Sequence, residues 1–279
     1  MTDIVWIEGR WAGLEEAKIP VYDRGLLLGD GVFESMRADN GYIFALKDHI
    51  DRLFKGLEIL KITPNYDKKQ LIDVVETGVK KSKLKKAYIR ITVTRGDGFG
   101  LLPKISKSRI IIIIKKLEDE KLENGIDVII SKIRRPSIKT GLPNIKSLNY
   151  LPSILAKLEA EKNKVQDALL LNQDEYVIEA TTSNIFFVKN DEIFYPSVDL
   201  GILEGITMKY IIKIAEKIGF NISEIAIKEK DLINFDEVFL TNSVRGIISV
   251  KTIENIELKN DFKVANRIRN EFSKYLKNQ

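Results

Sequence analysis

The chain has 279 residues, of which 44% are hydrophobic, so it can bury a sizeable core as one large domain or as two smaller ones. It contains no cysteine, which excludes disulfides, thiolate catalysis and cysteine-based metal sites. The only histidine, His49, excludes multi-histidine metal sites and argues against a Ser-His-Asp triad, so we expect no bound metal.

The net charge of +5 favours no particular polyanionic partner, because acidic and basic residues alternate along most of the chain. The densest basic run, Lys80–Lys86, falls where a helix should end, and the helix dipole favours cations there. No aromatic residue interrupts it, as a groove for single-stranded nucleic acid would require. No apolar run approaches the roughly 20 residues that cross a bilayer, and Met1–Trp6 lacks the layout of a secretory signal. We therefore expect a cytoplasmic protein that contacts neither nucleic acid nor membrane.

The N-terminal part predicts strands and two amphipathic helices. Alternating residues predict strands at 4–7, 32–38, 42–44, 88–94 and 108–116, with a hairpin turn at Asn40-Gly41. Apolar residues at three- and four-residue spacing predict a helix from Lys47 that Pro64 ends, and a second helix over 68–81. Five consecutive isoleucines, 110–114, predict a strand buried on both faces.

The stretch between Leu117 and Gly125 is charged and has few apolar residues that could join a core, which predicts a linker. We therefore expect a small N-terminal α/β domain over 1–117, a linker over 118–125 and a larger C-terminal domain over 126–279. The second domain should contain strands near 128–130, 168–171, 177–178, 185–188, 193–195 and 237–240. One helix should run to about Lys164, with an apolar face formed by Leu151, Ile154, Leu155 and Leu158. A second helix should follow Thr207 and point five residues inward: Met208, Ile211, Ile212, Ala215 and Ile218.

One lysine stands out by its context. Lys146 directly precedes the first of these helices, and Glu179 follows in a loop rich in Thr, Ser and Asn. A lysine can form a Schiff base with an aldehyde cofactor, and an acidic residue can keep the cofactor's pyridine nitrogen protonated.

Three segments are candidate phosphate ligands, each with an ordinary alternative. Gly205-Ile206-Thr207 begins a helix, where backbone N–H groups bind anions, although Thr207 could simply cap it. Thr241-Asn242-Ser243 offers small donors after a strand but could be a polar loop. Arg52 could bind phosphate bidentately or be a surface arginine.

The glycine-rich segments do not indicate nucleotide binding. Gly29-Asp30-Gly31 lacks the spacing of a phosphate-binding loop, and no dinucleotide fingerprint occurs. Gly96–Gly100 follows a strand without a subsequent helix, which favours a mobile loop over a site.

In this order, the segments resemble the class IV, or fold-type IV, pyridoxal-phosphate enzymes: branched-chain aminotransferases, D-amino-acid aminotransferases and aminodeoxychorismate lyases. The resemblance runs from about Ile4 to Val250. Its most specific parts are 23–25, 29–34, 49–53, 145–149, Glu179 with 183–186, and 205–207. It implies a two-domain α/β (α+β) fold with the site between the domains.

The resemblance also implies roles for individual residues. Lys146 would carry pyridoxal 5′-phosphate as a Schiff base and shuttle a proton between the substrate Cα and the cofactor C4′. Glu179 would pair with the pyridine nitrogen, and His49 would be structural, beside Arg52. The implied cofactor-binding residues also include Arg52, Ser183, Asn184, Ile206, Thr207, Asn242 and Ser243. The substrate side would comprise Phe33, Arg37, Tyr88, Arg90, Val244 and Arg245.

The motifs do not all indicate the same reaction within this family. Residues 33–37 and Tyr88-Ile89-Arg90 resemble segments of branched-chain aminotransferases, whereas the loop after Glu179 and residues 241–247 are more similar to lyases and D-amino-acid enzymes. Arg245 could anchor a second substrate carboxylate or form a structural ion pair.

We expect an aminotransferase acting between an amino acid, a branched-chain L- or a D-amino acid, and a 2-oxo acid such as 2-oxoglutarate. The alternative is an aminodeoxychorismate lyase that releases pyruvate and 4-aminobenzoate. A non-catalytic binding protein is a third possibility, against which the intact Lys146 and Glu179 argue. The resemblance further implies a homodimer or a dimer-based oligomer, since a neighbouring subunit's loop completes the site in such enzymes.

Overall fold

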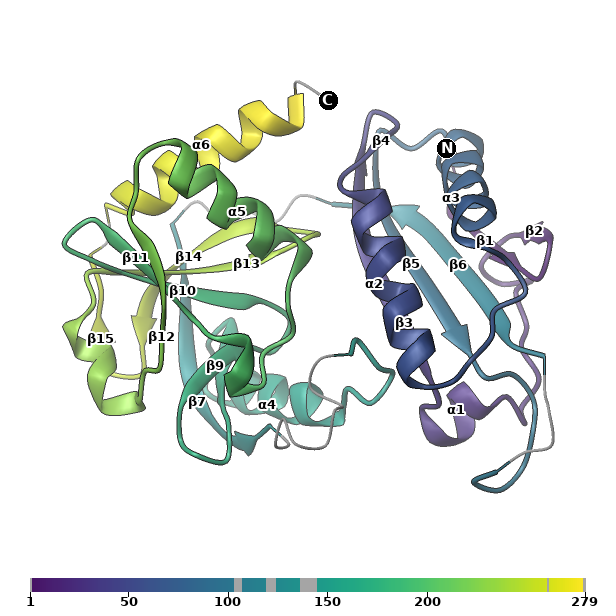
Figure 1. Cartoon of the computed structure of the whole chain (residues 1–279), viewed down its shortest axis with the longest axis horizontal. Helices are drawn as coiled ribbons and strands as arrows, with labels where there is room; N and C mark the ends of the chain where they lie inside the picture. The colour runs from purple at the N-terminus through teal and green to yellow at the C-terminus, as the bar shows by residue number, and fades with distance from the viewer. Residues whose placement is uncertain (1, 103–106, 119–123, 136–144, 260, 278–279) are drawn as a thin grey trace. The chain divides into compact units, whose positions relative to one another are not determined.

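The computed structural model describes residues 2–102, 107–118, 124–135, 145–259 and 261–277. The chain divides into two compact units, each described here by itself (Figure 1). The first unit comprises Met1–Asp119 and Ile145–Asn149, and the second comprises Glu120–Asn144 and Tyr150–Gln279. One segment departs from the predicted domains, because Ile145–Asn149 belongs to the first unit and not to the C-terminal domain. Residues 119–123 of the predicted linker lie outside the described residues.

The first unit is a six-stranded sheet with helices packed against it, in the strand order β2-β1-β6-β5-β3-β4. Its strands are β1 (Ile4–Ile7), β2 (Arg10–Ala12), β3 (Gly31–Asp39), β4 (Tyr42–Ile43), β5 (Lys86–Thr94) and β6 (Arg109–Lys116). Its helices are α1 (Arg24–Leu28), α2 (Leu46–Ile59) and α3 (Lys68–Ser82). All of the strand pairs are antiparallel. The predicted turn at Asn40-Gly41 joins β3 to β4, and both residues have the positive φ that such tight hairpins need.

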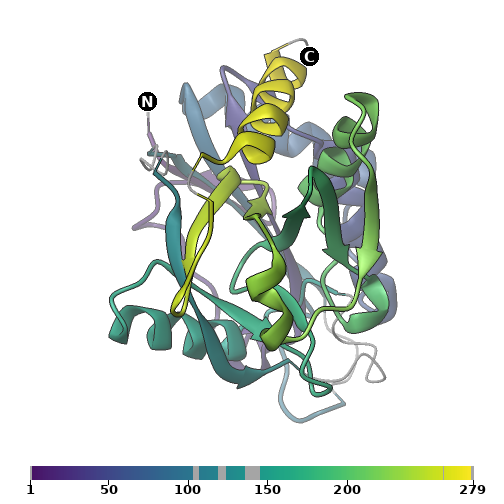
Figure 2. The same ribbon diagram turned by 90° about the vertical axis from the view of Figure 1, so that its left-hand side faces the viewer.

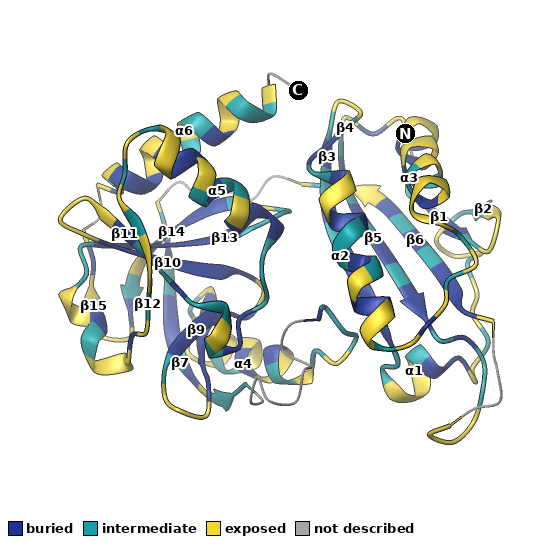
Figure 3. Ribbon diagram, viewed as in Figure 1, coloured by how far each residue is buried: buried dark blue, intermediate teal, exposed yellow. Residues whose placement is uncertain are grey.

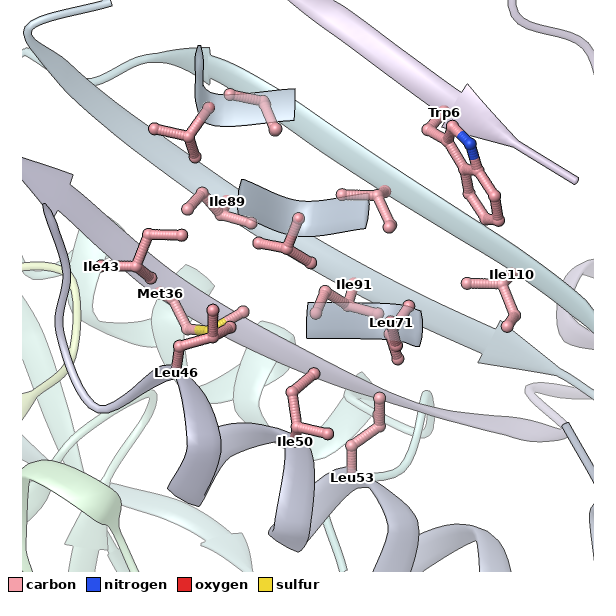
Figure 4. Packing of buried hydrophobic residues seen from close by; sticks show 14 of the residues in the cluster. Trp6, Met36, Ile43, Leu46, Ile50, Leu53, Leu71, Ile89, Ile91 and Ile110 are labelled. Atoms are coloured by element: carbon pink, nitrogen blue, oxygen red, sulfur yellow. The ribbon is translucent and has the colours of Figure 1, made fainter. Parts of the chain in front are cut away.

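The core of the first unit lies between α2, α3 and one face of the sheet. Alternate residues of β3, β5 and β6 point to this face, and α2 contributes residues at helical spacing. Figure 4 shows this packing, in which Met36, Ile89 and Ile91 of the sheet face Leu46, Ile50 and Leu53 of α2.

The isoleucine run does not form a strand buried on both faces, so that prediction is wrong. In β6, Ile110, Ile112 and Ile114 are buried, whereas Ile111 and Ile113 are only half-buried. The reason is the antiparallel sheet, in which alternate residues point to opposite faces and the helices cover one of them.

The end of α2 also differs from the prediction. The helix ends at Ile59, before Pro64 is reached. Lys61 adopts a left-handed conformation with φ 54°, and its N–H donates to Glu58 O at 3.0 Å. The N–H of Ile62 donates to Leu57 O at 2.9 Å. These two bonds define a Schellman motif, and buried Ile62 and Leu57 provide its apolar contact.

The second unit contains a nine-stranded sheet in the order β12-β11-β10-β13-β14-β7-β8-β9, with β15 paired to β14. Its strands are β7 (Ile126–Arg134), β8 (Asp167–Leu171), β9 (Val177–Ala180), β10 (Asn184–Lys189), β11 (Glu192–Pro196), β12 (Ile222–Ile225), β13 (Glu237–Asn242), β14 (Gly246–Ile253) and β15 (Ile256–Glu257). Strand β9 also pairs with β10, so the run from β10 through β13, β14, β7 and β8 to β9 closes on itself. The closing pair is Glu179 with Asn184, two of the predicted site residues.

Helices cover parts of this sheet. They are α4 (Leu151–Lys162), α5 (Ile206–Lys217) and α6 (Lys263–Lys277), with short 3₁₀ helices η2 (Val198–Leu200) and η3 (Glu229–Asn234). Helix α6, yellow in Figure 2, packs on β13 and β14 and against α5. Along α5, Met208, Ile211 and Ala215 are buried as predicted, whereas Ile212 and Ile218 are half-buried. Among the described residues, the helices fall short of the length and apolarity that a membrane span requires.

Helix α4 turns its predicted apolar face outward. Leu151, Ile154, Leu155 and Leu158 are 40–62% exposed. Helix α4 contacts β7 and β8, and the residues that it buries are Ser153, Ala156 and Ala160. Small side chains allow the helix to lie close to the sheet, so the large ones are left outside (Figure 3).

We expect Gly31→Ala to destabilise the protein by roughly 1–3 kcal/mol, as overpacking does in a close-packed interior. A Cβ at position 31 would lie 2.4 Å from Val93 O and 3.0 Å from a methyl carbon of Leu148. Urea unfolding measures the loss. Gly13→Ala is the matched control and should be near neutral, since its Cβ would meet nothing closer than 3.9 Å. Equal stability of the two variants would contradict the close approach.

Candidate active site

The segment that carries Lys146 is held against β3 by main-chain hydrogen bonds. Phe33 N–H donates to Lys146 O at 2.9 Å, and Leu148 N–H donates to Gly31 O at 3.0 Å. Val32 and Ser147 form the isolated antiparallel bridge between them. The lysine backbone is therefore positioned as firmly as an extra strand of the first unit, although it lies far from β3 in sequence.

The side chain of Lys146 lies beside an aromatic and cationic surface. Its Nζ is 4.7 Å from the centre of the Phe33 ring, and the guanidinium carbon of Arg90 is 3.7 Å from the same ring. Tyr88 OH and Ser35 Oγ share a hydrogen bond of 3.0 Å. Strand register places these residues on the sheet face opposite the core, because β3 and β5 pair residue by residue and their side chains alternate. Phe33, Tyr88 and Arg90 therefore lie on one face of the sheet, and their predicted contact with a substrate stays a prediction.

Arg37, another predicted substrate residue, lies on the same face near the end of β3. Its Nε and Nη2 donate to Asp39 at 2.5 and 2.9 Å, so its charge is paired within the strand. In the strand register Arg37 lies opposite Tyr88.

A buried charge cluster lies on the core side of β3. The Glu34 carboxylate, which is fully buried, accepts hydrogen bonds of 2.7 Å from Arg52 Nε, Arg52 Nη2 and His49 Nδ1. Burial by itself would raise the pKa of Glu34, but the charge of Arg52 and the hydrogen bonds from His49 and Arg52 outweigh it and lower the pKa to about 2.

His49 completes this cluster as a neutral donor. Its pKa is lowered by burial first, and further by the charges of Arg52 and Lys146, against the opposing effect of Glu34. Neutral His49 then donates through Nδ1 to Glu34, and its buried Nε2 has no hydrogen-bond partner among the described residues.

In the second unit, the Glu179 carboxylate accepts hydrogen bonds from two residues that are far from it in the sequence. Arg135 Nη2 donates to Glu179 Oε1 at 2.5 Å, and Leu203 N–H donates to Oε2 at 3.2 Å. Asn184, its partner across the closing strands, donates from Nδ2 to Leu203 O at 2.8 Å. Leu203 thereby links the two predicted cofactor residues.

Small hydroxyl and amide side chains gather at the start of α5. Thr207 Oγ1 and Ser243 Oγ share a hydrogen bond of 3.0 Å, and Asn242 Nδ2 donates to Ser183 Oγ at 2.9 Å. Thr207 does not cap the helix, because the N-cap is Gly205 and no side chain caps it. A Cβ at Gly205 would lie 1.9 Å from Asn184 Oδ1, so a larger residue here would displace the Asn184 side chain. The neighbouring Ile206 is buried.

Residues 242–246 form the tight turn between β13 and β14. Asn242 Oδ1 accepts hydrogen bonds from Val244 N–H at 3.0 Å and Arg245 N–H at 2.8 Å. The turn leaves Arg245 exposed and Val244 half-buried. Their predicted substrate contacts stay predictions.

Two residues that contact the predicted ones, one in each unit, were not singled out from the sequence. Glu34 had a readable signal, because it lies on the face of β3 occupied by Val32 and Met36, where a buried charge needs a partner. Arg52 and His49 have the helical spacing to provide it. Arg135 had no such signal, since it directly follows β7 and meets Glu179 only through the fold.

The fold and these groups define an α/β enzyme of the fold-type IV kind, and the comparisons agree. The family model for amino-transferase class IV matches residues 31–253. A Methanocaldococcus jannaschii protein assigned as a branched-chain-amino-acid aminotransferase is 40% identical over 258 residues, 92% of this chain and 90% of that protein. The aminodeoxychorismate lyase of Bacillus subtilis is 30% identical over 258 residues, 91% and 87% of the two chains.

A solved structure matches nearly the whole chain. The T.th. branched-chain amino acid aminotransferase in complex with N-(5′-phosphopyridoxyl)-L-glutamate has a TM-score of 0.92 and 26% identity, over 99% of this chain and 94% of that one. The chain belongs to the class IV aminotransferase family, and it is a transferase. The predicted fold class, family and type of enzyme are confirmed.

We expect Glu34→Gln to flatten the loss of stability in acid. The carboxyl titrates at 4.5 when unfolded and at about 2 when folded, so the unfolded chain takes up the proton first as the pH falls. Stability from Glu34 is present above pH 4.5 and is lost towards pH 2, by about 3 kcal/mol. The lowered pKa of His49 adds a loss of the same sign below pH 6.5.

Urea unfolding between pH 7 and pH 2 tests this expectation. Asp51→Asn is the control, because its carboxylate lies on the same helix but pairs with Lys68 in an exposed position. An unchanged pH slope in Glu34→Gln would contradict the assignment of the acid loss to the cluster.

Proposed function

We propose that the protein is a pyridoxal-phosphate-dependent aminotransferase that moves an amino group between a branched-chain L-amino acid and a 2-oxo acid such as 2-oxoglutarate. Family membership supports the transfer. The similarity to branched-chain enzymes, one of them solved with a phosphopyridoxyl-L-glutamate, supports the substrates and the cofactor. The observation that carries the proposal is Lys146, held to β3 with its amine beside Phe33 and Arg90.

The residues fit this cofactor. When bound, pyridoxal phosphate supplies an aldehyde and an electron-withdrawing ring. Lys146 offers the amine. Within the second unit, the uncapped start of α5 offers backbone N–H groups to a phosphate, with Thr207 and Ser243 as hydroxyl donors. The buried Glu179 carboxylate offers a partner for a protonated ring nitrogen.

These residues have distinct tasks in the proposed reaction. With the cofactor bound, Lys146 would be the base that takes the proton from the substrate Cα, and it would carry that proton to the cofactor. Glu179, oriented by Arg135 and Leu203, keeps the ring nitrogen protonated. Arg52 binds the phosphate as a guanidinium already fixed in the protein.

The face of the sheet around Arg90 suits an amino acid with a branched apolar side chain. Arg90 forms no ion pair with a described residue and stacks on Phe33, so its charge can meet the substrate carboxylate. Half-buried Ile113 lies directly opposite Arg90 in the register of β5 and β6, and it offers apolar surface beside the guanidinium. Tyr88, on the same face, provides a hydroxyl.

A lyase acting on aminodeoxychorismate is the second candidate, favoured by the similarity to the Bacillus subtilis enzyme. It would use the same lysine but no acceptor 2-oxo acid. Its product chemistry, release of pyruvate and 4-aminobenzoate, separates it from the first candidate.

We expect single L-amino acids with branched side chains to convert the bound cofactor to its amine form, because transamination proceeds through two half-reactions. The measurement is the cofactor's absorbance after mixing purified protein with one amino-acid enantiomer at a time. Lys146→Ala should lose both the spectral change and turnover, whereas Lys69→Ala, an exposed lysine of α3, should keep both. Release of aminobenzoate without any half-reaction would select the lyase.

We further propose that the protein is a homodimer and that the exposed face of α4 contributes to its interface. The four exposed residues of that face, Leu151, Ile154, Leu155 and Leu158, recur at helical spacing and form a continuous apolar stripe. Exposed Lys157 and Glu161 flank it with opposite charges, and a two-fold axis would bring such charges together. A second copy of the chain is therefore the occupant that we propose.

The variant Leu155→Glu with Leu158→Glu should sediment as a smaller species than the wild type, because a buried unpaired charge opposes association. Analytical ultracentrifugation over a range of concentrations measures this. Ile233→Glu is the control, since this exposed residue lies on η3 and is not part of the apolar face of α4. A double variant with the sedimentation of the wild type would contradict the interface.

A further inference from the structure

A fully buried carboxylate faces α2 from the middle of the apolar side of β3. Val32 and Met36, two residues to either side of Glu34, are in the core, so Glu34 stands where an apolar residue would be ordinary. His49 and Arg52 lie on the face of α2 that meets it. An ionised group in such a place is costly unless it is paired, and its presence calls for a use beyond stability.

The pairing fixes the guanidinium of Arg52 in one plane. Arg52 Nε and Nη2 donate to the two different oxygens of Glu34, both at 2.7 Å, and this bidentate contact sets the orientation as well as the position of the guanidinium. The carboxylate cannot turn in response, because His49 Nδ1 holds Oε2 from the other side at 2.7 Å. The arginine side chain, which is long and flexible in general, is thereby preorganised.

We propose that Glu34 is a positioning residue, which holds Arg52 in the orientation that binds the phosphate of the cofactor. The proposal rests on the proposed function of Arg52 as a phosphate ligand. His49 supports Glu34 in turn, and none of the three needs to contact the reacting atoms.

Charge and orientation have opposite consequences, and this makes the proposal testable. The negative charge of Glu34 opposes the approach of an anion, so an effect of charge alone would give tighter phosphate binding when Glu34 is neutralised. A positioning role gives the reverse, because Arg52 loses its bidentate anchor and must be ordered by the ligand itself.

The test compares pyridoxamine 5′-phosphate with pyridoxamine, which lacks the phosphate, in binding to the cofactor-free full-length chain. Neither ligand has an aldehyde, so Lys146 forms no covalent bond, and fluorescence titration gives the dissociation constants directly. We expect E34Q to weaken pyridoxamine 5′-phosphate by about tenfold or more and pyridoxamine by less than about twofold, since only the phosphate meets Arg52.

Further variants separate orientation from charge and from folding. E34D keeps the charge but withdraws the carboxylate from the bidentate contact, and it should also weaken the phosphorylated ligand selectively; it serves as well if E34Q does not fold. D51N, on the same helix with exposed Lys68 as its partner, should change neither ligand. In R52K, the added E34Q change should have no further effect, because the two residues act as one unit.

Three outcomes overturn the proposal: tighter binding of pyridoxamine 5′-phosphate to E34Q, equal weakening of both ligands, or full additivity in the double variant. The ligand preference of R52K tests the proposed function itself. If R52K leaves the preference for the phosphorylated ligand unchanged, Arg52 is not a phosphate ligand. If R52K loses that preference and E34Q keeps it, Arg52 stands and the role of Glu34 fails.

Discussion

The short main-chain pairing between the lysine segment and β3 is the constraint on which the rest of the first unit's chemistry depends. A lysine amine can be held at one place only when its backbone is fixed, because the reach of the side chain is otherwise wide. Phe33 N–H and Gly31 O provide that fixation, and Gly31 allows it because a side chain there would collide with Val93 O. The same strand then presents Phe33 to Lys146 on one face and Glu34 to Arg52 on the other. Consecutive residues of one strand thus set the positions of an amine and of a guanidinium.

The charges of the first unit illustrate why buried ion pairs are informative about function and less so about stability. An ionised carboxylate in an apolar core is held at the expense of desolvation, and an apolar residue of similar size would often be at least as stable. Glu34 is nevertheless ionised, bonded to Arg52 at both oxygens and to His49 at one. The surface pair of Asp51 and Lys68 on the same helix is exposed and contributes little by comparison. What distinguishes the buried pair is the fixed geometry of its guanidinium.

Local patterns predicted most of the elements, because periodicity reports which face of an element is buried. Strands β3 and β5 and helix α3 lie close to their predicted positions. The failures arose where a neighbour decided the outcome. In α4 the sheet accepts Ser153, Ala156 and Ala160, so the large apolar residues remain outside. The pairing of the lysine segment with β3 and that of Arg135 with Glu179 join residues far apart in the chain, and no periodicity encodes such pairs. The context of Lys146 and Glu179 in the sequence singled them out, and the resemblance of the whole ordered set of motifs then gave each a role.

The lysine amine does not decide between transferase and lyase chemistry. Both reactions begin with an amine acting at the cofactor, so Lys146 serves either and cannot distinguish them. The distinction has to come from the groups that bind the parts of the substrate away from the reacting carbon, since that binding decides which bond is presented for reaction. The groups that we propose for this on the first unit are a guanidinium, a phenol and the half-buried Ile113, which would suit a small carboxylate with an apolar side chain. Under the proposed function, this surface would favour the amino-acid substrate over a larger, more polar one.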